Sequence, residues 1–390
     1  NEEGIAFYQD IIDECLKYNI EPMVTIYHWD LPQALVDEYQ GWESPRIIDD
    51  YVHYAKTLFS RFDGKVKYWI TLNEQNIFTS LGWLTAQHPP GKFDDQKMFY
   101  QVNHHAFMAH AKAVLAYRQM GGKGQIGASF AYTPSYALDC KPINAMAKAN
   151  YDDLKNYWWM DVYAYGRYPV AAMTYLKKKG IAPDIADGDK EILRQAASQI
   201  TFMGVNYYQS CVCEYNPMDG VTPYGTMNTT GVKGSAQELG MPGIYKNPAN
   251  PYLMTTDWDW SIDPSGLQFC CREITSRYAL PIVISENGLG AFDKKTEDGQ
   301  IHDEYRICYL KEHIKALGEA VEEGCQVLAY CTWSFTDLLS WLNGYQKRYG
   351  FIYVDREEEE GGTLERFKKD SFYWYKKVIE TNGKEIFEEE

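Results

Sequence analysis

The chain has 390 residues, of which 45% are hydrophobic, 24% charged and 15% aromatic. This composition excludes collagen-like, fibrous and disordered proteins, and no apolar run reaches the roughly 18 residues of a membrane helix. The net charge of −16 argues against nucleic acid or an anionic membrane as a partner, because phosphate groups need a basic surface. We also expect no signal peptide, since the first residues form neither a basic n-region nor an apolar h-region.

The nine cysteines are odd in number and scattered, and none has the C-x2-C spacing of a zinc site or redox motif. We therefore expect free thiols in a reducing cytosol, with no metal and no redox cofactor.

Helical stretches alternate with short apolar runs along the chain. Amphipathic helices are predicted at 7–20, 51–62 and 103–120, and the chain opens on the first of them. Apolar runs that end in polar or aromatic residues follow at 23–32, 66–76, 125–135, 200–210, 281–288 and 326–337. Their nearly continuous apolarity is typical of parallel strands buried on both faces.

The positions of unusual residues favour an α/β fold of the TIM (β/α)8 barrel type. An open doubly wound sheet would show a Gly-rich phosphate turn after an early strand, and none is present. In a barrel, functional residues gather at the carboxyl ends of the strands. The residues found there are His28, Glu74, Asn206, Glu286 and Trp333. We expect one catalytic domain over 1–390, two strands short of a full barrel, with 211–262 as a long loop that walls a pocket.

Two carboxylates, Glu74 and Glu286, each follow an apolar run directly. At one rim of a barrel they suit a retaining glycosidase, in which the paired carboxyl groups stand about 5–5.5 Å apart. The charge of one raises the pKa of the other, so that one is a nucleophile while the other keeps its proton as the acid.

The motifs TLNEQN, ISENG, TIYHWDLPQAL and FMGVNYY resemble, in order, those of glycoside hydrolase family 1. The resemblance implies a barrel that cleaves β-glycosides with retention, with Glu74 as the acid/base and Glu286 as the nucleophile. It further implies that Tyr208 donates a hydrogen bond to the nucleophile. The residues expected to bind the sugar or its leaving group are His28, Trp29, Asn73, Asn206, Trp258, Trp260, Trp333 and Trp341, with Trp333 beneath the sugar ring and Trp258 and Trp260 on the aglycone side.

The stretch 337–356 resembles the 6-phospho-β-glycosidase branch of that family. Members that accept unmodified glucosides mostly carry Glu directly before a tryptophan in this stretch. This chain has Ser340 there, directly before Trp341. A carboxylate there would repel a phosphate on the sugar O6. Ser340, Lys347 and Tyr349 together resemble a phosphate clamp, and of the two adjacent cations only Lys347, not Arg348, is assigned to the phosphate.

The expected substrate is a 6-phospho-β-glucoside, hydrolysed in the cytoplasm. Trp341 instead favours a 6-phospho-β-galactosidase, while the residues after 348 favour the gluco members. Two other functions also remain open, namely a broad β-glucosidase and an inactive sugar-phosphate binder. Assembly into a homo-oligomer is a further open alternative. Family members begin with two further βα units, so we expect this polypeptide to lack roughly the family's first fifth and to be poorly active alone.

Overall fold

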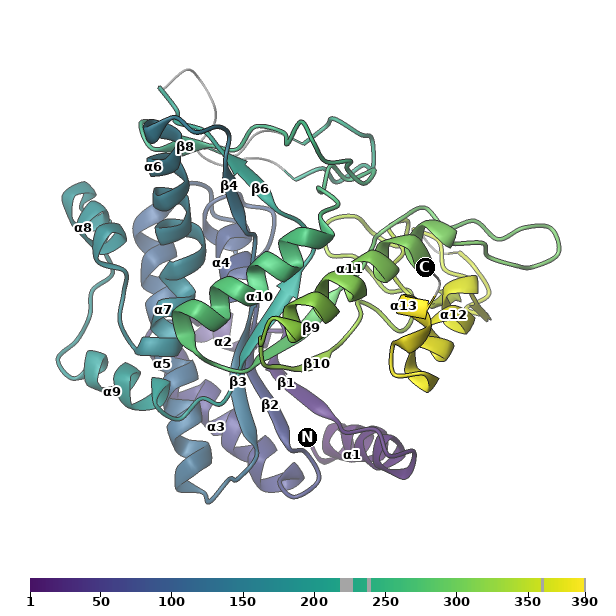
Figure 1. Ribbon diagram of the computed structural model, residues 1–390. Coiled ribbons are helices and arrows are strands. Elements are labelled where there is room, and N and C mark those ends of the chain that lie inside the picture. The colour runs from purple at the N-terminus through teal and green to yellow at the C-terminus, as the bar shows by residue number, and fades with distance from the viewer. Residues whose placement is uncertain (218–226, 237–239, 359–360, 389–390) are drawn as a thin grey trace. The chain divides into compact units, whose positions relative to one another are not determined.

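The computed structural model describes residues 1–390 except 218–226, 237–239, 359–360 and 389–390. Figure 1 labels the helices and strands. The chain divides into two compact units, each described here by itself. The first comprises Asn1–Ala131 and Asp152–Gly204, and the second comprises Tyr132–Tyr151 and Val205–Glu390.

The first unit contains three complete strands, and most of its remaining residues are helical. Its elements are α1 (Glu2–Lys17), β1 (Met23–Tyr27), α2 (Gln33–Tyr39), η1 (Gly41–Glu43), α3 (Arg46–Phe62), β2 (Tyr68–Asn73), α4 (Gln75–Trp83), α5 (Gln96–Gln119), β3 (Gln125–Ala131), η2 (Asp152–Asn156), α7 (Tyr157–Tyr165), α8 (Val170–Lys179), α9 (Asp189–Ala197) and the first two residues of β5 (Met203–Tyr207).

The second unit holds the rest of β5 and the following elements of the chain. They are β4 (Ser135–Ala137), α6 (Pro142–Tyr151), β6 (Cys211–Cys213), β7 (Gly240–Met241), β8 (Tyr245–Lys246), α10 (Pro264–Tyr278), β9 (Ile282–Asn287), α11 (Glu304–Glu322), β10 (Val327–Tyr330), β11 (Ile352–Val354), β12 (Arg366–Lys368), α12 (Asp370–Glu380) and α13 (Lys384–Glu388).

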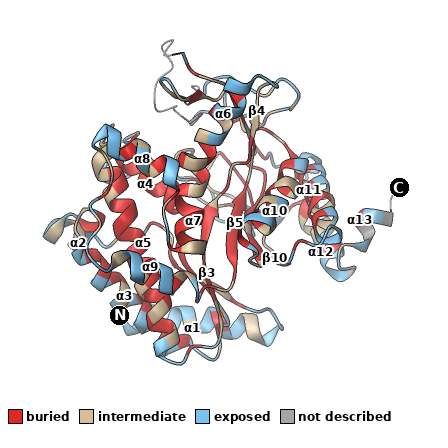
Figure 2. Ribbon diagram, turned by 60° about the vertical axis from the view of Figure 1, so that its left-hand side comes forward, coloured by how far each residue is buried: buried red, intermediate tan, exposed pale blue. Residues whose placement is uncertain are grey.

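In the first unit β1, β2 and β3 pair in parallel, in that order. Strand β2 is buried from Trp69 to Asn73, as a strand covered on both faces requires. Helix α5 begins at Asp95, whose carboxylate accepts a hydrogen bond from the Met98 amide at 3.2 Å. The helix packs against α3 and is buried along most of its length, as its red colour in Figure 2 shows.

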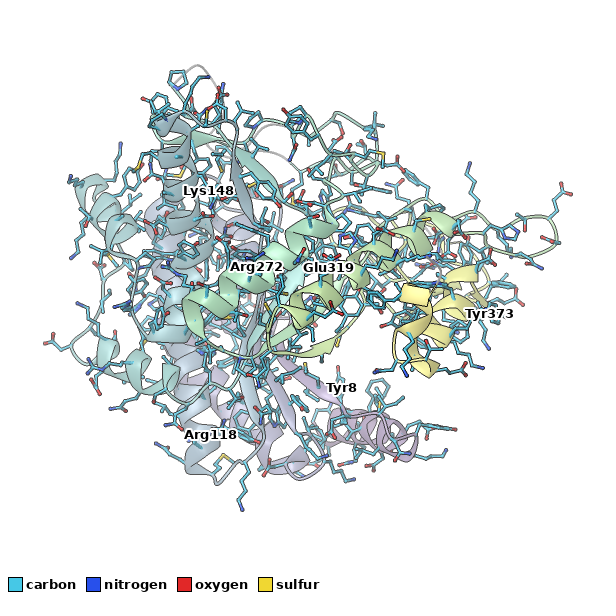
Figure 3. The ribbon with its side chains drawn as sticks, in the orientation of Figure 1. Tyr8, Arg118, Lys148, Arg272, Glu319 and Tyr373 are labelled. Atoms are coloured by element: carbon cyan, nitrogen blue, oxygen red, sulfur yellow. The ribbon has the colours of Figure 1, made fainter. Side chains whose placement is uncertain are left out.

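Helix α1 is different, because apolar side chains lie on its outer surface. Phe7 and Tyr8 are 61% and 59% exposed, and Figure 3 shows Tyr8 extending away from the ribbon. The helix is amphipathic as predicted, but Ile12 is its one residue that is buried among those described.

In the second unit β9 lies between β5 and β10, and it pairs with β10 in parallel. Helix α10 begins at Asp263, whose carboxylate accepts from the Gly266 amide at 3.0 Å, and Pro264 occupies the first turn, where its missing N–H costs nothing. The helix packs against α11.

The predicted α/β class and the predicted strands are confirmed. The six apolar runs contain β1, β2, β3, β5, β9 and β10, and the three predicted helices overlap α1, α3 and α5. The range 211–262 differs from the expected plain loop, because it contains β6, β7 and β8; part of it lies outside the described residues. Strand β6 pairs in parallel with β4 through short polar-flanked runs, which are too brief to give a strand signal in the sequence.

Candidate active site

In the first unit the predicted site residues stand at the carboxyl ends of β1 and β2. His28 and Trp29 follow β1, while Asn73 ends β2 and Glu74 comes next. The Asn73 side-chain amide lies 3.2 Å from His28 Nε2, and the Trp29 indole N–H donates to the Asn73 carbonyl at 3.0 Å. Because β1 and β2 are parallel neighbours, residues far apart in sequence meet at one edge of the sheet.

Burial lowers the pKa of His28, although the nearby charge of Asp30 opposes the shift. The ring is therefore neutral near pH 7. A neutral ring with its proton on Nδ1 accepts the Asn73 amide hydrogen at Nε2. The Asn73 and His28 side chains thus orient each other. Trp29 is buried, and its N–H is engaged by the Asn73 backbone, so its sugar-binding role stays a prediction.

Glu74 occupies an unusual backbone conformation. It has φ 46° and ψ 55°, in the left-handed region that side-chain-bearing residues seldom adopt, and it directly precedes α4. Its amide donates to the Ser129 carbonyl at 2.9 Å, and its own carbonyl accepts from the Ile77 amide at 2.9 Å. Such a conformation costs on the order of 1–3 kcal/mol and is characteristic of functional positions.

The residue after Glu74 anchors the start of α4. The Gln75 side-chain amide donates to the Asn103 side-chain oxygen at 2.8 Å, and its oxygen accepts from the Tyr163 hydroxyl at 2.7 Å. Gln75 is fully buried. Sequence analysis did not identify this residue, although a glutamine beside a predicted catalytic carboxylate was a visible signal.

In the second unit Tyr208 and Glu286 are in direct contact. The Tyr208 hydroxyl donates to Glu286 Oε2 at 2.6 Å, as the family resemblance implied. Glu286 lies in β9 and is buried, and Tyr208 comes directly after β5. A phenol hydrogen bond favours the ionised form of a carboxylate and fixes its orientation. Asn206 also meets β9, because its side-chain oxygen accepts from the Ser285 hydroxyl at 2.7 Å.

Asn287, directly after Glu286, ties neighbouring strands together. Its side-chain amide donates to the Tyr207 carbonyl at 2.8 Å, and its oxygen accepts from the Tyr330 hydroxyl at 2.7 Å. Its backbone carbonyl accepts from the Trp333 amide at 2.8 Å. Trp333 itself is half-buried. Sequence analysis gave Asn287 no role, because only the folded chain shows which strands it joins.

Lys347 is the most unusual cation of the second unit. Its side chain is buried, and its Nζ has no hydrogen-bond partner among the described residues. The ammonium stands 3.7 Å from the ring centre of Trp260, 4.8 Å from that of Trp258 and 5.5 Å from that of Tyr349. Burial lowers the pKa of Lys347 to about 7.

Gly290 provides the space that Lys347 and Tyr349 occupy. A Cβ at this position would stand 2.5 Å from Lys347 Cε and 2.8 Å from Tyr349 Cζ, closer than carbon atoms can approach. Two of the three predicted clamp residues are therefore brought together, with a glycine beside them that the sequence analysis did not single out.

Ser340, the third predicted clamp residue, lies in a tight turn. Its amide donates to the Gly344 carbonyl at 3.0 Å, and its hydroxyl oxygen accepts from the Asn343 side-chain amide at 3.1 Å. This leaves the hydroxyl hydrogen for another acceptor. Its membership of the clamp stays a prediction.

The remaining predicted tryptophans lie in different surroundings. Trp258 is fully buried against Phe292, with ring centres 4.6 Å apart, so it cannot face an aglycone as expected. Trp260 is half-buried and contacts Lys347 and Tyr208, with the Tyr208 ring centre 5.4 Å away. Trp341 is 46% exposed. Neither Trp260 nor Trp341 is thereby excluded from binding substrate.

Arg348 has different contacts from its neighbour Lys347. Its guanidinium donates to Asp337 at 3.0 Å and to the Val354 carbonyl at 2.7 Å. Its own carbonyl accepts from Arg306 at 3.0 Å. These contacts commit the Arg348 guanidinium to the protein, and the assignment of Lys347 alone to a ligand stays a prediction.

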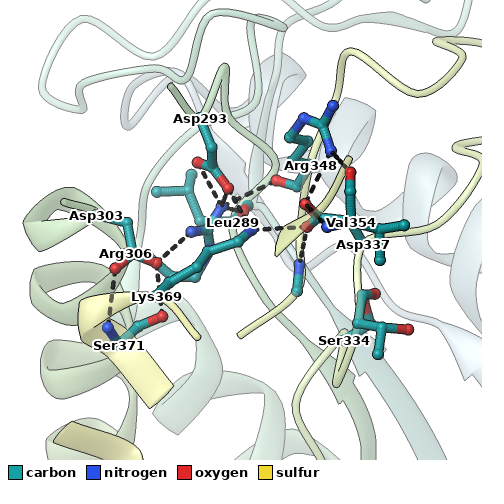
Figure 4. A network of polar contacts seen from close by, with 12 residues as sticks. Leu289, Asp293, Asp303, Arg306, Ser334, Asp337, Arg348, Val354, Lys369 and Ser371 are labelled. Carbon is teal, nitrogen blue, oxygen red and sulfur yellow. Dashed lines mark hydrogen bonds and ion pairs between the residues drawn. The ribbon is translucent and has the colours of Figure 1, made fainter. Parts of the chain in front are cut away.

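Arg348 belongs to a buried network of charges, shown in Figure 4. Asp337 accepts from Lys369 at 2.6 Å as well as from Arg348. Lys369 also contacts Asp293, which accepts from Arg306 at 3.1 Å. The network continues from Arg306 to Asp303 and Ser371. Burial alone would raise the pKa of Asp293, but the charges of Arg306 and Lys369 outweigh it and lower that pKa.

Two comparisons with known proteins identify the family. The Glycosyl hydrolase family 1 model matches residues 1–384, and the chain therefore belongs to that family and is a glycosidase. A family 1 b-glucosidase from Thermotoga maritima has a similar structure, with a TM-score of 0.85 and 32% identity over 98% of this chain and 79% of that one. The fold is accordingly that of the TIM-barrel glycosidases of family 1.

Among curated proteins, the chain is 54% identical to the aryl-phospho-beta-D-glucosidase BglC of Bacillus subtilis, over 99% of this chain and 80% of that protein. It is 38% identical to the 6-phospho-beta-glucosidase AscB of Escherichia coli, over 99% of this chain and 77% of that protein.

The described residues include no group of three or more histidine, cysteine or acidic side chains arranged to hold a metal ion. Within the same residues, no helix combines the length and apolarity needed to cross a membrane.

Replacing Asp337 with alanine should destabilise the protein strongly. The change leaves Lys369 and Arg348 buried with one acceptor fewer, and breaking a buried ion pair typically costs about 3–5 kcal/mol. Urea unfolding of Asp337→Ala against the parent measures the loss. Glu380→Ala is the control, because its carboxylate pairs with Lys376 on the exposed surface of α12 at 3.6 Å. The control should change stability by less than about 0.5 kcal/mol. An equally small effect of both substitutions would contradict a structural role for the network.

Proposed function

We propose that the protein hydrolyses 6-phospho-β-glucosides with retention of configuration and releases glucose 6-phosphate. The observation that carries this proposal is the buried ammonium of Lys347, which has no hydrogen-bond partner among the described residues. Burying a lone cation is costly, so a site that keeps one is suited to an anionic ligand. The names of BglC and AscB, both phospho-β-glucosidases, support the same substrate class.

In the proposed reaction, the Glu286 carboxylate attacks the anomeric carbon while Glu74 gives its proton to the departing glycosidic oxygen. This forms a glycosyl ester on Glu286 and releases the aglycone alcohol. Glu74, now ionised, takes a proton from a water molecule that attacks the same carbon and breaks the ester. The Tyr208 hydrogen bond supports the role of Glu286, because it orients the carboxylate that must attack.

The proposed sugar contacts follow the family resemblance. Asn73 holds the 2-hydroxyl, His28 and Asn206 hold further hydroxyls, and Trp333 offers its apolar face to the ring. At the O6 end, Lys347, Tyr349 and Ser340 take the phosphate. We further propose that residues 1–390 act as one catalytic domain in the cytoplasm.

The first test compares nitrophenyl β-glucoside with its 6-phosphate. The phosphorylated compound should have the higher kcat/KM. Lys347→Met should raise its KM by about 10- to 100-fold, since a hydrogen bond to a charged group contributes about 1.5–3 kcal/mol, and should leave the unphosphorylated compound nearly unchanged. Ser340→Glu should shift preference toward the free sugar.

Lys141→Met serves as the matched control, because Lys141 is exposed and pairs with Asp139 at 2.7 Å. Faster cleavage of the unphosphorylated compound by the unmodified protein would overturn the proposed substrate and leave a broad β-glucosidase. Nitrophenyl β-galactoside 6-phosphate, assayed alongside, tests the galacto alternative.

A slow 2-fluoro-glucoside 6-phosphate with a good leaving group tests the covalent step. Incubation should add the mass of one fluoroglucosyl phosphate to the protein, and peptide mass spectrometry should place it on Glu286. Glu286→Gln should gain no mass, because the amide is a poor nucleophile. Saturable binding without any adduct would instead indicate a sugar-phosphate binder that does not catalyse.

The pH dependence of KM tests the role of Lys347. Its pKa is lowered to about 7, so the ammonium is charged below that pH and becomes neutral above it. The phosphate is a dianion above about pH 6 and prefers the charged form. The KM for the phosphorylated substrate should therefore rise roughly fivefold from pH 7 to pH 8 relative to that of the unphosphorylated one. Titration of the catalytic carboxyl groups affects both substrates alike, so its effect cancels in the ratio of the two KM values. A ratio that stays flat above pH 7, or the same rise in Lys347→Met, would contradict this role.

A further inference from the structure

Trp260 was expected to face the aglycone, yet its described contacts are with Lys347 and Tyr208. The Lys347 ammonium is 3.7 Å from its ring centre, well inside the roughly 6 Å range of a cation–π contact. Trp258 and Tyr349 stand at 4.8 Å and 5.5 Å, so the three rings form what we call the aromatic cage of Lys347.

The backbone around Trp260 is held firmly. The Thr256 hydroxyl accepts from the Trp260 amide at 3.2 Å, and the Trp260 carbonyl accepts from the Thr256 amide at 2.9 Å. The adjacent Asp259, at φ 64°, accepts from the Gly234 amide at 2.6 Å and from the Ala236 amide at 3.0 Å. The ring thus projects from a fixed turn.

An aromatic partner suits a cation that must later bind an anion. A carboxylate beside Lys347 would neutralise it, occupy its N–H groups and repel a phosphate. An indole face stabilises the ammonium through the negative potential of its π electrons and accepts no conventional hydrogen bond. No Lys347 N–H group is therefore bound to an acceptor among the described residues, and the N–H groups that do not face a ring remain available to phosphate oxygens.

We infer that Trp260 is a positioning residue that sets the preference for phosphorylated substrates, because it holds the Lys347 ammonium in place before the substrate arrives. This inference rests on the proposed function. It gives Trp260 a role at the phosphate end of the substrate, in addition to the aglycone contact that the family resemblance implies. The same ring contacts Tyr208, whose hydroxyl donates to Glu286, the proposed nucleophile.

The test compares Trp260→Leu and Trp260→Phe on nitrophenyl β-glucoside and its 6-phosphate. The leucine variant loses the π face, so its KM for the phosphorylated compound should rise about tenfold relative to that for the other compound. The phenylalanine variant keeps a smaller ring and should show about a threefold rise. Tyr252→Leu is the control, since Tyr252 lies in the same segment and is 90% exposed; it should change neither KM.

A second readout is the pH at which the KM ratio begins to rise. Loss of the π face favours the neutral amine, so this rise should begin at lower pH in Trp260→Leu and, to a smaller extent, in Trp260→Phe. A residue with only a structural role would not change the pH at which the KM ratio begins to rise. Equal losses of kcat/KM on both substrates with an unmoved pH profile would overturn the inference.

The phenylalanine variant keeps an aromatic ring in the space that Trp260 fills. If Trp260→Leu does not fold, Trp260→Phe therefore provides the test of the inference. The outcomes also separate the two proposals. If the unmodified protein prefers the free glucoside, the proposed function fails. If it prefers the phosphorylated one and the Trp260 variants keep that preference unchanged, only this inference fails.

Discussion

The loop that carries Lys347 depends most on the hydrogen bonds and ion pairs made by the Asp337 carboxylate. This carboxylate receives Lys369, Arg348 and the backbone amide of Gly350, so one buried group holds the chain on both sides of the turn between Ser340 and Tyr349. Arg306 adds a second anchor by donating to the Arg348 carbonyl. Buried charges stabilise a fold only when each is paired, and this network meets that condition through alternating acids and bases.

Two consecutive cations of this loop, Lys347 and Arg348, have opposite environments. Arg348 is neutralised by Asp337 and bound to backbone carbonyls, whereas Lys347 is surrounded by aromatic rings and has no described hydrogen-bond acceptor. The first cation is committed to the structure, and the second is the one that the proposed function assigns to the phosphate. The difference agrees with the chemistry of the side chains, since the planar guanidinium suits several fixed acceptors and the ammonium is a compact point charge.

Much of the fold and part of the site could be predicted from the sequence. Apolar runs identify strands such as β2 and β9, because burial on both faces favours apolar side chains, and the residues that end these runs are the expected ones. The Tyr208–Glu286 contact followed from a family motif. The network around Asp337 could not be predicted, because its members are dispersed over α11, α12 and connecting segments and no periodicity links them. The contact of Trp260 with Lys347 could not be predicted for a related reason, because no sequence pattern indicates which side chain a tryptophan in a loop covers.

Gly290 contributes no functional group, yet it determines the space that is available to Lys347 and Tyr349. The space beside it is filled by Lys347 and Tyr349, and any side chain there would collide with both. A single added methyl group could therefore displace the cation without altering any residue that touches the sugar. Under the proposed function, a side chain at this position would weaken phosphate binding through steric hindrance alone.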